Sequence, residues 1–253
     1  MKLVILQARM SSSRLPGKVL KDVNGMPMIY WQLNRIAKAK SVNKIVVATS
    51  TDTSDNPLVD FLITQKIDFV RGSLNNVKER FDLALREFPA DSFIRLTGDC
   101  PLVMPALIDD LANDFDEAEV DYLSNTIDPT FPDGLDIEIV ATEAFKRLGP
   151  DGLSKAEMEH VTYGLYSRVG EFRIKNFVNT QDLSHLRWTV DYQEDLDFVR
   201  QVFKQFEGKE TSFTYEELIT HLRENPALKS RIHGSRRNES LISMLKEEDS
   251  VDG

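Results

Sequence analysis

The chain has 253 residues, of which 41% are hydrophobic and 28% are charged, and its formal net charge at pH 7 is −10. This is the composition of an ordinary globular protein with a sizeable core, which excludes a fully disordered or fibrous chain. The acidic balance argues against a broad nucleic-acid or anionic-membrane surface, since both need clustered basic charge, so an anionic ligand must meet a local basic pocket.

Short apolar runs alternate with amphipathic segments along the first half of the chain. Strands are predicted at Leu3 to Leu6, Ile45 to Ala48 and Phe93 to Leu96. The helices that follow them are predicted at Met28 to Ala39, Leu58 to Thr64 and Leu107 to Phe115. This alternation predicts an α/β fold, in which a buried and mainly parallel sheet carries helices on both faces.

The alternation breaks between about residues 120 and 177. A turn-rich DPTFPDG, a strand-like IEIV, a helical LSKAEMEHVTYGLYSRV and a strand-like EFRIKNF follow one another there. We expect an excursion from the sheet, suited to covering a substrate or making a dimer contact, before the sheet resumes at Leu186 to Val190. Residues 1–224 then form a single domain, and the polar residues 225–253 form a solvated tail.

The N-terminal part of the sequence predicts neither export nor a membrane span. Its apolar run is followed at once by Arg9, without the apolar stretch and cleavage site of a secretory signal. No apolar stretch approaches the length of a membrane-spanning helix. The single cysteine, Cys100, cannot form an internal disulfide. We therefore expect a cytoplasmic protein.

The loop after the first predicted strand has the sequence ARMSSSRLPGK. It contains three basic side chains, Arg9, Arg14 and Lys18, and three serines that include Ser12. Loops at the carboxyl ends of strands in open α/β sheets bind ligands, and a triphosphate needs N–H groups, hydroxyls and cations together. The loop therefore indicates a triphosphate site, although a solvated connector has the same composition. The GxxxxGK[ST] pattern of ATPases and GTPases is absent.

Two aspartates each follow a strand-like segment. Asp99 comes after FIRLTG, and Asp191 comes after RWTV. Mg²⁺ prefers oxygen ligands and is commonly held by one or two carboxylates together with substrate phosphates, so this pair indicates a magnesium site. The alternative for both residues is capping of the helix that follows.

Several motifs occur together and in order, and they resemble those of the sugar cytidylyltransferases. They are QARMSSSRLPGKVL with NGMPMI, RGSLNNVKERF, RLTGDCPLV, EHVT and RWTVDYQEDLDFV. The resemblance includes the synthetases of CMP-activated octulosonic and nonulosonic acids, and it is strongest to the branch of SpsF-like spore coat polysaccharide biosynthesis proteins. It covers most of the chain and extends to IHGSRRNESLISML near its end.

The resemblance implies a three-layer fold like that of nucleotide-diphospho-sugar transferases, which is Rossmann-like and has a mainly parallel, mixed sheet. It implies an enzyme that transfers CMP from CTP to an acidic or surface-polysaccharide sugar and releases pyrophosphate. It also implies Mg²⁺ as the cofactor and a homodimer as the assembly. Nucleic acids and membranes are not among the expected partners.

The same resemblance assigns roles to individual residues. The nucleotide-binding set is Ala8, Arg9, Ser12, Arg14, Lys18, Arg71, Asn76 and Arg80. Within this set, Ala8 lies where the backbone passes close to the base. The catalytic set is Arg9, Lys18 and Asp99, and the metal ligands are Asp99 and Asp191.

On the acceptor side, the resemblance places Asp133, Gly134 and Glu138 where the family contacts the sugar. Taken alone, the Asp-Gly pair is as typical of a plain hairpin turn. Glu157 and His160 are three residues apart on one helix face, a spacing more typical of a surface pair than of a metal site. The EHVT match favours a place for His160 at the acceptor pocket.

Two other functions remain open from the sequence. One is a nucleotidyltransferase that uses GTP or UTP on a sugar phosphate, because base selection often depends on backbone contacts. The other is a non-catalytic nucleotide-binding subunit. A glycosyltransferase is disfavoured, because the strand ends in GDCP and has no DxD pair.

Overall fold

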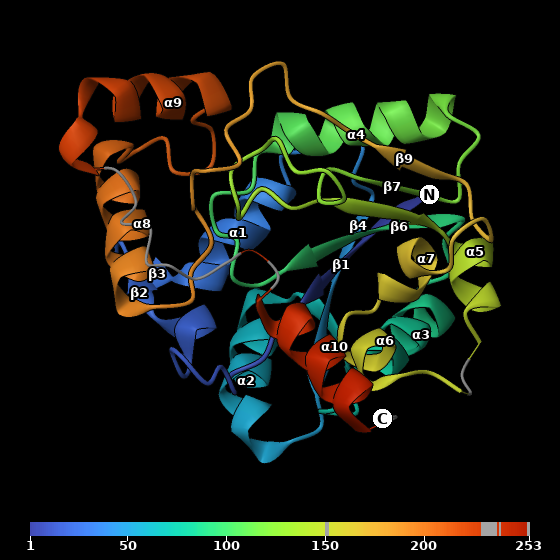
Figure 1. Cartoon of the computed structure of the whole chain (residues 1–253). Helices are drawn as coiled ribbons and strands as arrows, with labels where there is room; N and C mark the ends of the chain where they lie inside the picture. Colours follow the sequence, from blue (N-terminus) through green and yellow to red (C-terminus); the bar gives the residue numbers. More distant parts are fainter. Residues whose placement is uncertain (150–151, 229–236, 238, 252–253) are drawn as a thin grey trace.

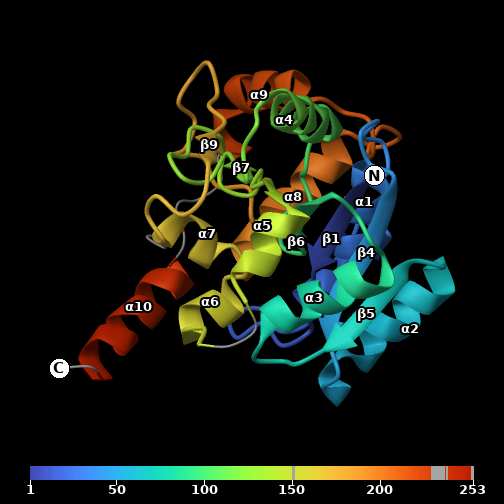
Figure 2. The same cartoon turned by 90° about the vertical axis from the view of Figure 1, so that its right-hand side faces the viewer.

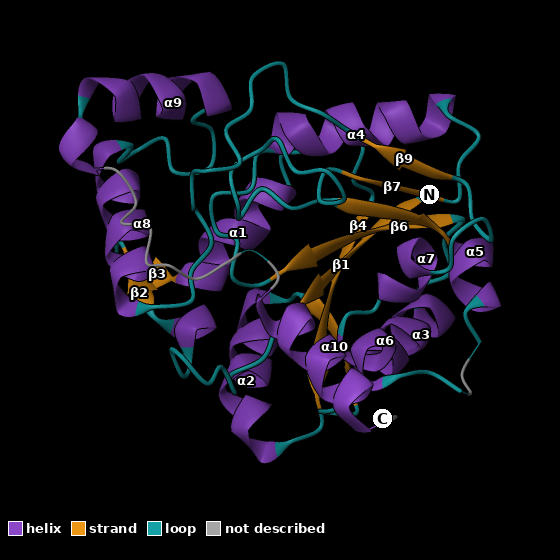
Figure 3. Cartoon of the chain, viewed as in Figure 1, coloured by secondary structure: helices purple, strands orange, loops and turns teal. Residues whose placement is uncertain are grey.

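The computed structural model describes residues 1–149, 152–228, 237 and 239–251. Strands run through its centre and helices surround them (Figures 1 and 3). The strands are β1 (Lys2–Gln7), β2 (Asp22–Val23), β3 (Met26–Pro27), β4 (Lys44–Ser50), β5 (Asp68–Gly72), β6 (Ser92–Thr97), β7 (Tyr122–Ser124), β8 (Glu138–Ala141) and β9 (Ile174–Asn176).

The α-helices are α1 (Met28–Ile36), α2 (Asn56–Gln65), α3 (Val77–Glu87), α4 (Pro105–Glu117), α5 (Thr142–Arg147), α6 (Lys155–Glu159), α7 (Tyr163–Ser167), α8 (Gln193–Gln205), α9 (Tyr215–Glu224) and α10 (Glu239–Val251). The short 3₁₀ helices are η1 (Lys18–Leu20), η2 (Thr53–Asp55) and η3 (Pro226–Leu228). Several helices begin at a residue that the sequence marks for it. Asn76, Ser154 and Thr214 cap α3, α6 and α9 with their side chains, and Pro105 occupies the first turn of α4.

The main sheet has the strand order β5-β4-β1-β6-β8-β7-β9. The four strands β5, β4, β1 and β6 are parallel to one another. β8 is antiparallel to both β6 and β7, and β9 is parallel to β7. The predicted sheet, mixed and mainly parallel, is confirmed.

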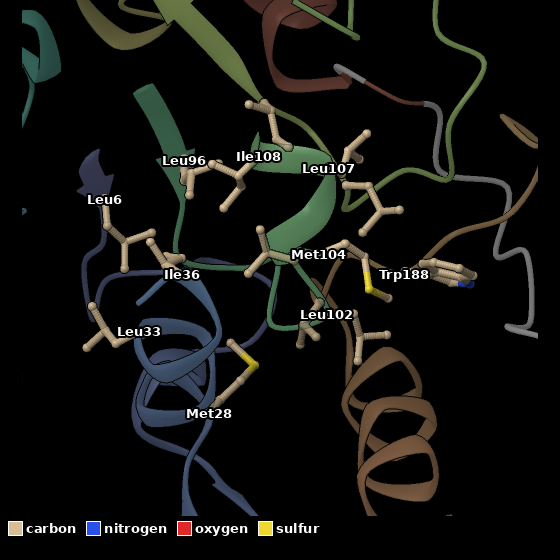
Figure 4. Packing of buried hydrophobic residues seen from close by; sticks show 14 of the residues in the cluster. Leu6, Met28, Leu33, Ile36, Leu96, Leu102, Met104, Leu107, Ile108 and Trp188 are labelled. Atoms are coloured by element: carbon tan, nitrogen blue, oxygen red, sulfur yellow. The ribbon is translucent and has the colours of Figure 1, made fainter. Parts of the chain in front are cut away.

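Two hydrophobic layers cover the two faces of this sheet. Val4 and Leu6 of β1 belong to one layer and Leu3 and Ile5 to the other, because successive side chains of a strand point to opposite faces. The first layer contains residues of α1, α2, α4, α8 and α9, and Figure 4 shows part of it. The second layer contains residues of α3, α5 and α7. All four of these β1 side chains are fully buried, so β1 is a rigid base for the loop that follows it.

The expectation of an excursion from the sheet at residues 120–177 is wrong in one respect, because the strands of this segment belong to the main sheet. β7, β8 and β9 extend the sheet beyond β6. They are only three or four residues long and the pairing becomes antiparallel here, so the spacing of strands and helices changes without a separate unit being formed. The helical segment predicted within the same range forms two short helices, α6 and α7.

The expectation of a strand at Leu186 to Val190 is also wrong. Within the described chain this segment makes only an isolated bridge, between Asp133 and Arg187. The backbone N–H groups of Trp188 and Thr189 both donate to the carbonyl of Asp133, at 2.6 and 3.0 Å. The segment is therefore extended and buried, but it crosses the loops at the strand ends and does not join the sheet.

The end of the chain contains a helix where a solvated tail is expected. α10 packs beside α6 (Figure 2), and the N–H of Ala156 donates to Glu248 Oε1 at 3.0 Å. Leu241 of α10 is buried. Of the motif IHGSRRNESLISML, residues 232–236 and 238 lie outside the described residues.

Candidate active site

A cavity of about 850 Å³ opens at the carboxyl ends of β1 and β6. The loop after β1 forms one wall, and the segments around Asp99, Asp133 and Asp191 form others. Residues of α10 also line it, among them Leu241 and Ile242. This is the edge of an open α/β sheet at which ligands bind, as the position of the basic loop predicts.

The loop after β1 closes on itself before it reaches Lys18. The carbonyl of Met10 accepts hydrogen bonds from the N–H groups of Ser12 and Gly17, both at 2.9 Å. Gly17 has a φ of +69°, in the left-handed region that favours glycine. The bend at Pro16 and Gly17 therefore returns the chain to the cavity, where η1 begins at Lys18.

Lys18 lies at the junction of the two predicted metal ligands. Its Nζ donates to Asp99 Oδ2 and Asp191 Oδ1, both at 3.0 Å, and to the carbonyl of Val190 at 2.8 Å. Burial opposes the charge of Lys18, but the two carboxylates outweigh it and raise its pKa. Burial of Asp99 is likewise outweighed by Lys18, which holds the pKa of that carboxyl below its usual range. All three donors of the ammonium are used, so the Lys18 side chain is held in one position.

Asp191 is shared among three cations. Lys18 and Arg14 both contact its Oδ1, with Arg14 Nη2 at 2.8 Å, and Arg187 Nη2 donates to its Oδ2 at 2.7 Å. The sequence does not identify Arg187 as a site residue. The available signal is an arginine within the otherwise apolar run Leu186 to Val190.

Arg187 joins several segments at the floor of the cavity. Besides Asp191 it contacts Asp133 Oδ2 at 2.8 Å and both carboxylate oxygens of Asp195 at 3.4 Å. Its side chain is 7% exposed, so these ion pairs are shielded from water. Burial opposes the charge, but the three aspartates raise the pKa of Arg187 above its ordinary value.

The capping alternative is wrong for both predicted metal ligands. The residue that precedes α4 is Met104, five positions after Asp99. The residue that caps α8 is Tyr192, and Asp195 completes that capping box by accepting from the N–H of Tyr192 at 2.9 Å. Asp99 and Asp191 therefore cap neither helix, and both line the cavity.

Two further acidic residues, Asp133 and Asp136, line the cavity. Burial and the nearby charge of Asp136 raise the pKa of Asp133 to about 7. Burial also raises the pKa of Asp136, although this residue is paired with Arg237. Arg237 additionally donates to the carbonyl of Phe131 at 3.2 Å. A carboxyl such as Asp133 can hold or release a proton near neutral pH.

Glu138 is fixed by partners that the sequence does not single out. Its Oε2 accepts from Arg95 Nη1 at 2.7 Å and from Thr162 Oγ1 at 2.8 Å. Arg95 also donates to Gln7 Oε1 at 3.1 Å, which ties β6 to β1 beneath the cavity. Arg95 is 43 positions from Glu138, so only the register of β6 and β8 brings the pair together.

Arg9 and His160 line the cavity from distant parts of the sequence. Arg9 Nη2 contacts Glu159 Oε1 at 3.0 Å, and His160 lines the cavity next to it. The buried Nε2 of His160 has no hydrogen-bond partner among the described residues. Glu157 does not pair with His160, because it completes the capping box of α6 and binds Arg168.

His160 makes the stability of the protein sensitive to acid. Burial, with the charge of Arg95, lowers its pKa from the usual 6.5 to about 4. The unfolded chain therefore binds a proton between pH 6.5 and 4 that the folded chain does not, so stability is lost as pH falls through this window, by up to about 3 kcal/mol. We expect His160→Gln to flatten this dependence in urea unfolding curves. The same curves for His185→Gln, at an exposed histidine, serve as the control, and an unchanged slope for His160→Gln would contradict the expectation.

Arg71 and Asn76 are held by local structure. Arg71 donates to the carbonyls of Ser50 and Asp52 at 2.8 and 3.0 Å. Asn76 Oδ1 accepts from the N–H of Glu79 at 3.1 Å and so caps α3. Neither residue is among the described residues that line the cavity.

Arg80 and Gly134 also lie behind the described cavity wall. Arg80 is fully buried and its Nη1 contacts the carbonyl of Ala48 at 3.5 Å. Gly134 lies in a turn closed by the N–H of Leu135 on the carbonyl of Pro132, and its φ is +106°. A Cβ at this position would lie 2.4 Å from the N of Thr189, so glycine is required for the turn to pack on that segment.

The two carboxylates that meet at Lys18, those of Asp99 and Asp191, fit a single Mg²⁺ that takes its other ligands from phosphates. Asp99 and Asp191 converge on one ammonium group, so their carboxylates lie close together. Among the described residues no group of three or more histidine, cysteine, aspartate or glutamate side chains forms a complete metal site. The protein can thus supply two carboxylates and would need the substrate to supply the rest.

Comparison with known proteins assigns the chain to a protein family. A family model described as cytidylyltransferase matches residues 3–230. The chain belongs to this family. It is 30% identical over 234 residues to the spore coat polysaccharide biosynthesis protein SpsF of Bacillus subtilis, covering 88% of this chain and 95% of that protein. The chain is therefore a nucleotidyltransferase.

Solved structures of two cytidylyltransferases share the fold. A cytidylyltransferase from Leptospira borgpetersenii superposes with a TM-score of 0.86 at 28% identity, covering 91% of this chain and 97% of that one. The synthetase of CMP-2-keto-3-deoxy-manno-octonic acid superposes with a TM-score of 0.63 at 18% identity, over 81% and 98% of the two chains. The expected sugar cytidylyltransferase family and its three-layer fold are confirmed.

The described helices include none that is long and apolar enough to span a membrane. The cytoplasmic location, the homodimer and the single domain at 1–224 stay predictions.

Proposed function

We propose that this enzyme transfers CMP from CTP to a sugar hydroxyl in the cavity after β1, with release of pyrophosphate. The observation that carries the proposal is the Lys18 ammonium, placed by the basic loop between Asp99 and Asp191. The SpsF relative and the octulosonic acid synthetase, whose structure was solved with CTP, support an acidic or surface-polysaccharide sugar as acceptor.

The triphosphate would bind to the three cations of the loop. Each cation contacts a carboxylate in this structure: Arg9 contacts Glu159, while Arg14 and Lys18 contact Asp191. A triphosphate carries more charge than one carboxylate and offers several oxygens, so it can replace these contacts. The carboxylates thus keep the cations in place before the nucleotide arrives.

Asp99 and Asp191 would hold Mg²⁺ together with the phosphates. When bound, Mg²⁺ supplies polarisation of the α-phosphate and lowers the pKa of the attacking hydroxyl. Lys18, whose contact with Asp191 the phosphates replace, stabilises the charge that builds on them. Alignment and charge stabilisation suffice for such a transfer, so no protein nucleophile is required.

The acceptor sugar would bind in the same cavity beside the triphosphate. Asp133, Glu138 and His160 line the cavity and offer acceptors, or a donor, for sugar hydroxyls. Asp133, whose pKa is raised to about 7 by burial, can accept a proton from the sugar near neutral pH. Arg187 and Arg95 fix the orientations of Asp133 and Glu138.

Pyrophosphate release with Mg²⁺, four nucleoside triphosphates and a panel of sugars tests the proposal. We expect release only with CTP, and only when an acidic or surface-polysaccharide sugar is present. Release with GTP or UTP and a sugar phosphate would assign another nucleotidyltransferase activity. Tight CTP binding without release from any sugar would indicate a non-catalytic subunit.

A further inference from the structure

Asp55 is a fully buried carboxylate that lies next to the basic loop without lining the described part of the cavity. It occupies the residue before α2, where an aspartate commonly caps the helix. Within the described chain its side chain makes no such capping bond. Instead, Asp55 Oδ1 accepts from the N–H of Met10 at 2.6 Å, 45 positions away. The helix thus lacks a side-chain cap, and the carboxylate serves the loop.

The second oxygen of Asp55 fixes the carboxylate itself. Asp55 Oδ2 accepts from Thr49 Oγ1 and from the N–H of Ser50, both at 3.1 Å, and also from Ser50 Oγ. Both donor residues are fully buried at the end of β4. One oxygen is therefore anchored on the sheet, and the other is directed at the loop.

Met10 is the residue on which the loop closes. The N–H that Asp55 binds belongs to the peptide between Arg9 and Met10. The carbonyl of Met10 accepts from the N–H of Gly17, which immediately precedes Lys18. A hydrogen bond from the buried carboxylate to Met10 therefore acts on both ends of the loop, at Arg9 and at Lys18.

A second buried side chain, Arg80, supports the same junction of β1 with the loop. It is fully buried, and its Nη1 contacts the carbonyl of Ala48, which also accepts from the N–H of Ala8 at 3.2 Å. Burial and the charge of Arg9 lower the pKa of Arg80 to about 10, while the charges of Glu159 and Asp55 act in the opposite direction. The junction of β1 with the loop is thus held by Asp55 at Met10 and by Arg80 through the carbonyl of Ala48.

We propose that Asp55 is a positioning residue for the basic loop. Through Met10 it holds Arg9 and Lys18 in their places at the cavity before a triphosphate binds. The proposal rests on the proposed function, since it requires the loop to bind phosphates. Preorganisation of this kind raises affinity because the loop is ordered in advance, so its loss should weaken triphosphate binding by about 10-fold or more.

The test compares Asp55→Ala with Asp55→Asn and with Thr49→Val. Thr49→Val removes one bond to Oδ2 and leaves the bond to Met10, so it is the matched control. Hydrogen exchange measures protection of the loop amides from Met10 to Lys18. Calorimetry measures binding of Mg·CTP and of inorganic tripolyphosphate, and steady-state assays give KM for CTP and for the sugar.

We expect Asp55→Ala to remain folded by circular dichroism, to exchange its loop amides faster and to bind both phosphate ligands about 10-fold more weakly, with KM for the sugar unchanged. Asp55→Asn keeps an acceptor for Met10 and should weaken binding less. If Asp55→Ala unfolds, Asp55→Asn with faster loop exchange and weaker tripolyphosphate binding than Thr49→Val carries the same conclusion.

Two results would overturn the positioning role. One is wild-type loop exchange and phosphate affinity in Asp55→Ala. The other is an equal loss in Thr49→Val, which would make Asp55 a support of β4 alone. Failure of the proposed function differs from both: the wild-type protein would then bind tripolyphosphate but release no pyrophosphate from CTP, and the exchange data would still decide the role of Asp55.

Discussion

Lys18→Ala is expected to reduce the rate of pyrophosphate release by about 100- to 1,000-fold, the cost of removing one preorganised group that stabilises developing charge. Lys18 Nζ contacts Asp99 and Asp191 at once. Its removal takes a cation from the phosphates and also leaves two carboxylates facing each other. The measurement is kcat and KM at saturating Mg²⁺, with circular dichroism to establish folding.

The control for this variant is Lys21→Ala, which removes a lysine three residues later that lies outside the described cavity lining. It should leave kcat within about two-fold, since a surface charge contributes little. Lys18→Arg should not restore activity, because a planar guanidinium cannot replace a point charge with three converging partners. Undiminished turnover in folded Lys18→Ala would remove Lys18 from the mechanism.

The loop and its two aspartates were predictable from the sequence because each follows a strand-like segment. The carboxyl ends of parallel strands meet at one edge of a sheet, so the ends of β1 and β6 must lie together. Asp191 follows an extended segment that is not a strand of the sheet, yet the N–H of Val190 still donates to the carbonyl of Asp99 at 2.8 Å. Asp191 thus lies beside Asp99, as predicted, although the segment before it is not the strand that the prediction assumed.

The arginines that organise the site were not predictable, because their partners are distant in sequence. Arg187 meets Asp133, which is 54 positions away, and Arg237 meets Asp136 at 101 positions. No local pattern encodes such pairs. Arg71, which its motif assigns to the nucleotide, donates to backbone carbonyls in this structure, and its nucleotide-binding role stays a prediction.

The membership of β7, β8 and β9 in the main sheet was not predictable, although β8 and β9 overlap the strand-like IEIV and EFRIKNF. β7 has three residues, too few for a period-two pattern to be distinguished from a loop. β8 pairs antiparallel to both β6 and β7, so the alternation of parallel strands and helices ends here. Tertiary pairing decides these elements, and local propensity does not.

Arg187→Ala is expected to lower the free energy of unfolding by about 3–5 kcal/mol, because removing one partner of a buried ion pair leaves uncompensated charge. Three aspartates, the buried Asp191 and Asp195 and the partly buried Asp133, lose a shared cation in this variant. Urea unfolding at pH 7 gives the measurement. Arg200→Ala is the matched control, because its partner Asp197 is half exposed and such a pair contributes no more than about 0.5 kcal/mol.

The pH dependence of Arg187→Ala separates lost charge from lost packing. The charge of Arg187 acts to lower the pKa of Asp133, which burial and Asp136 nevertheless raise to about 7. Without Arg187 this pKa rises further, so the folded variant binds a proton above pH 7 that the unfolded chain has released. Its stability should therefore keep falling from pH 7 to 9, where the wild-type curve levels off. A loss of the same size at every pH would instead show that Arg187 stabilises the site by packing alone.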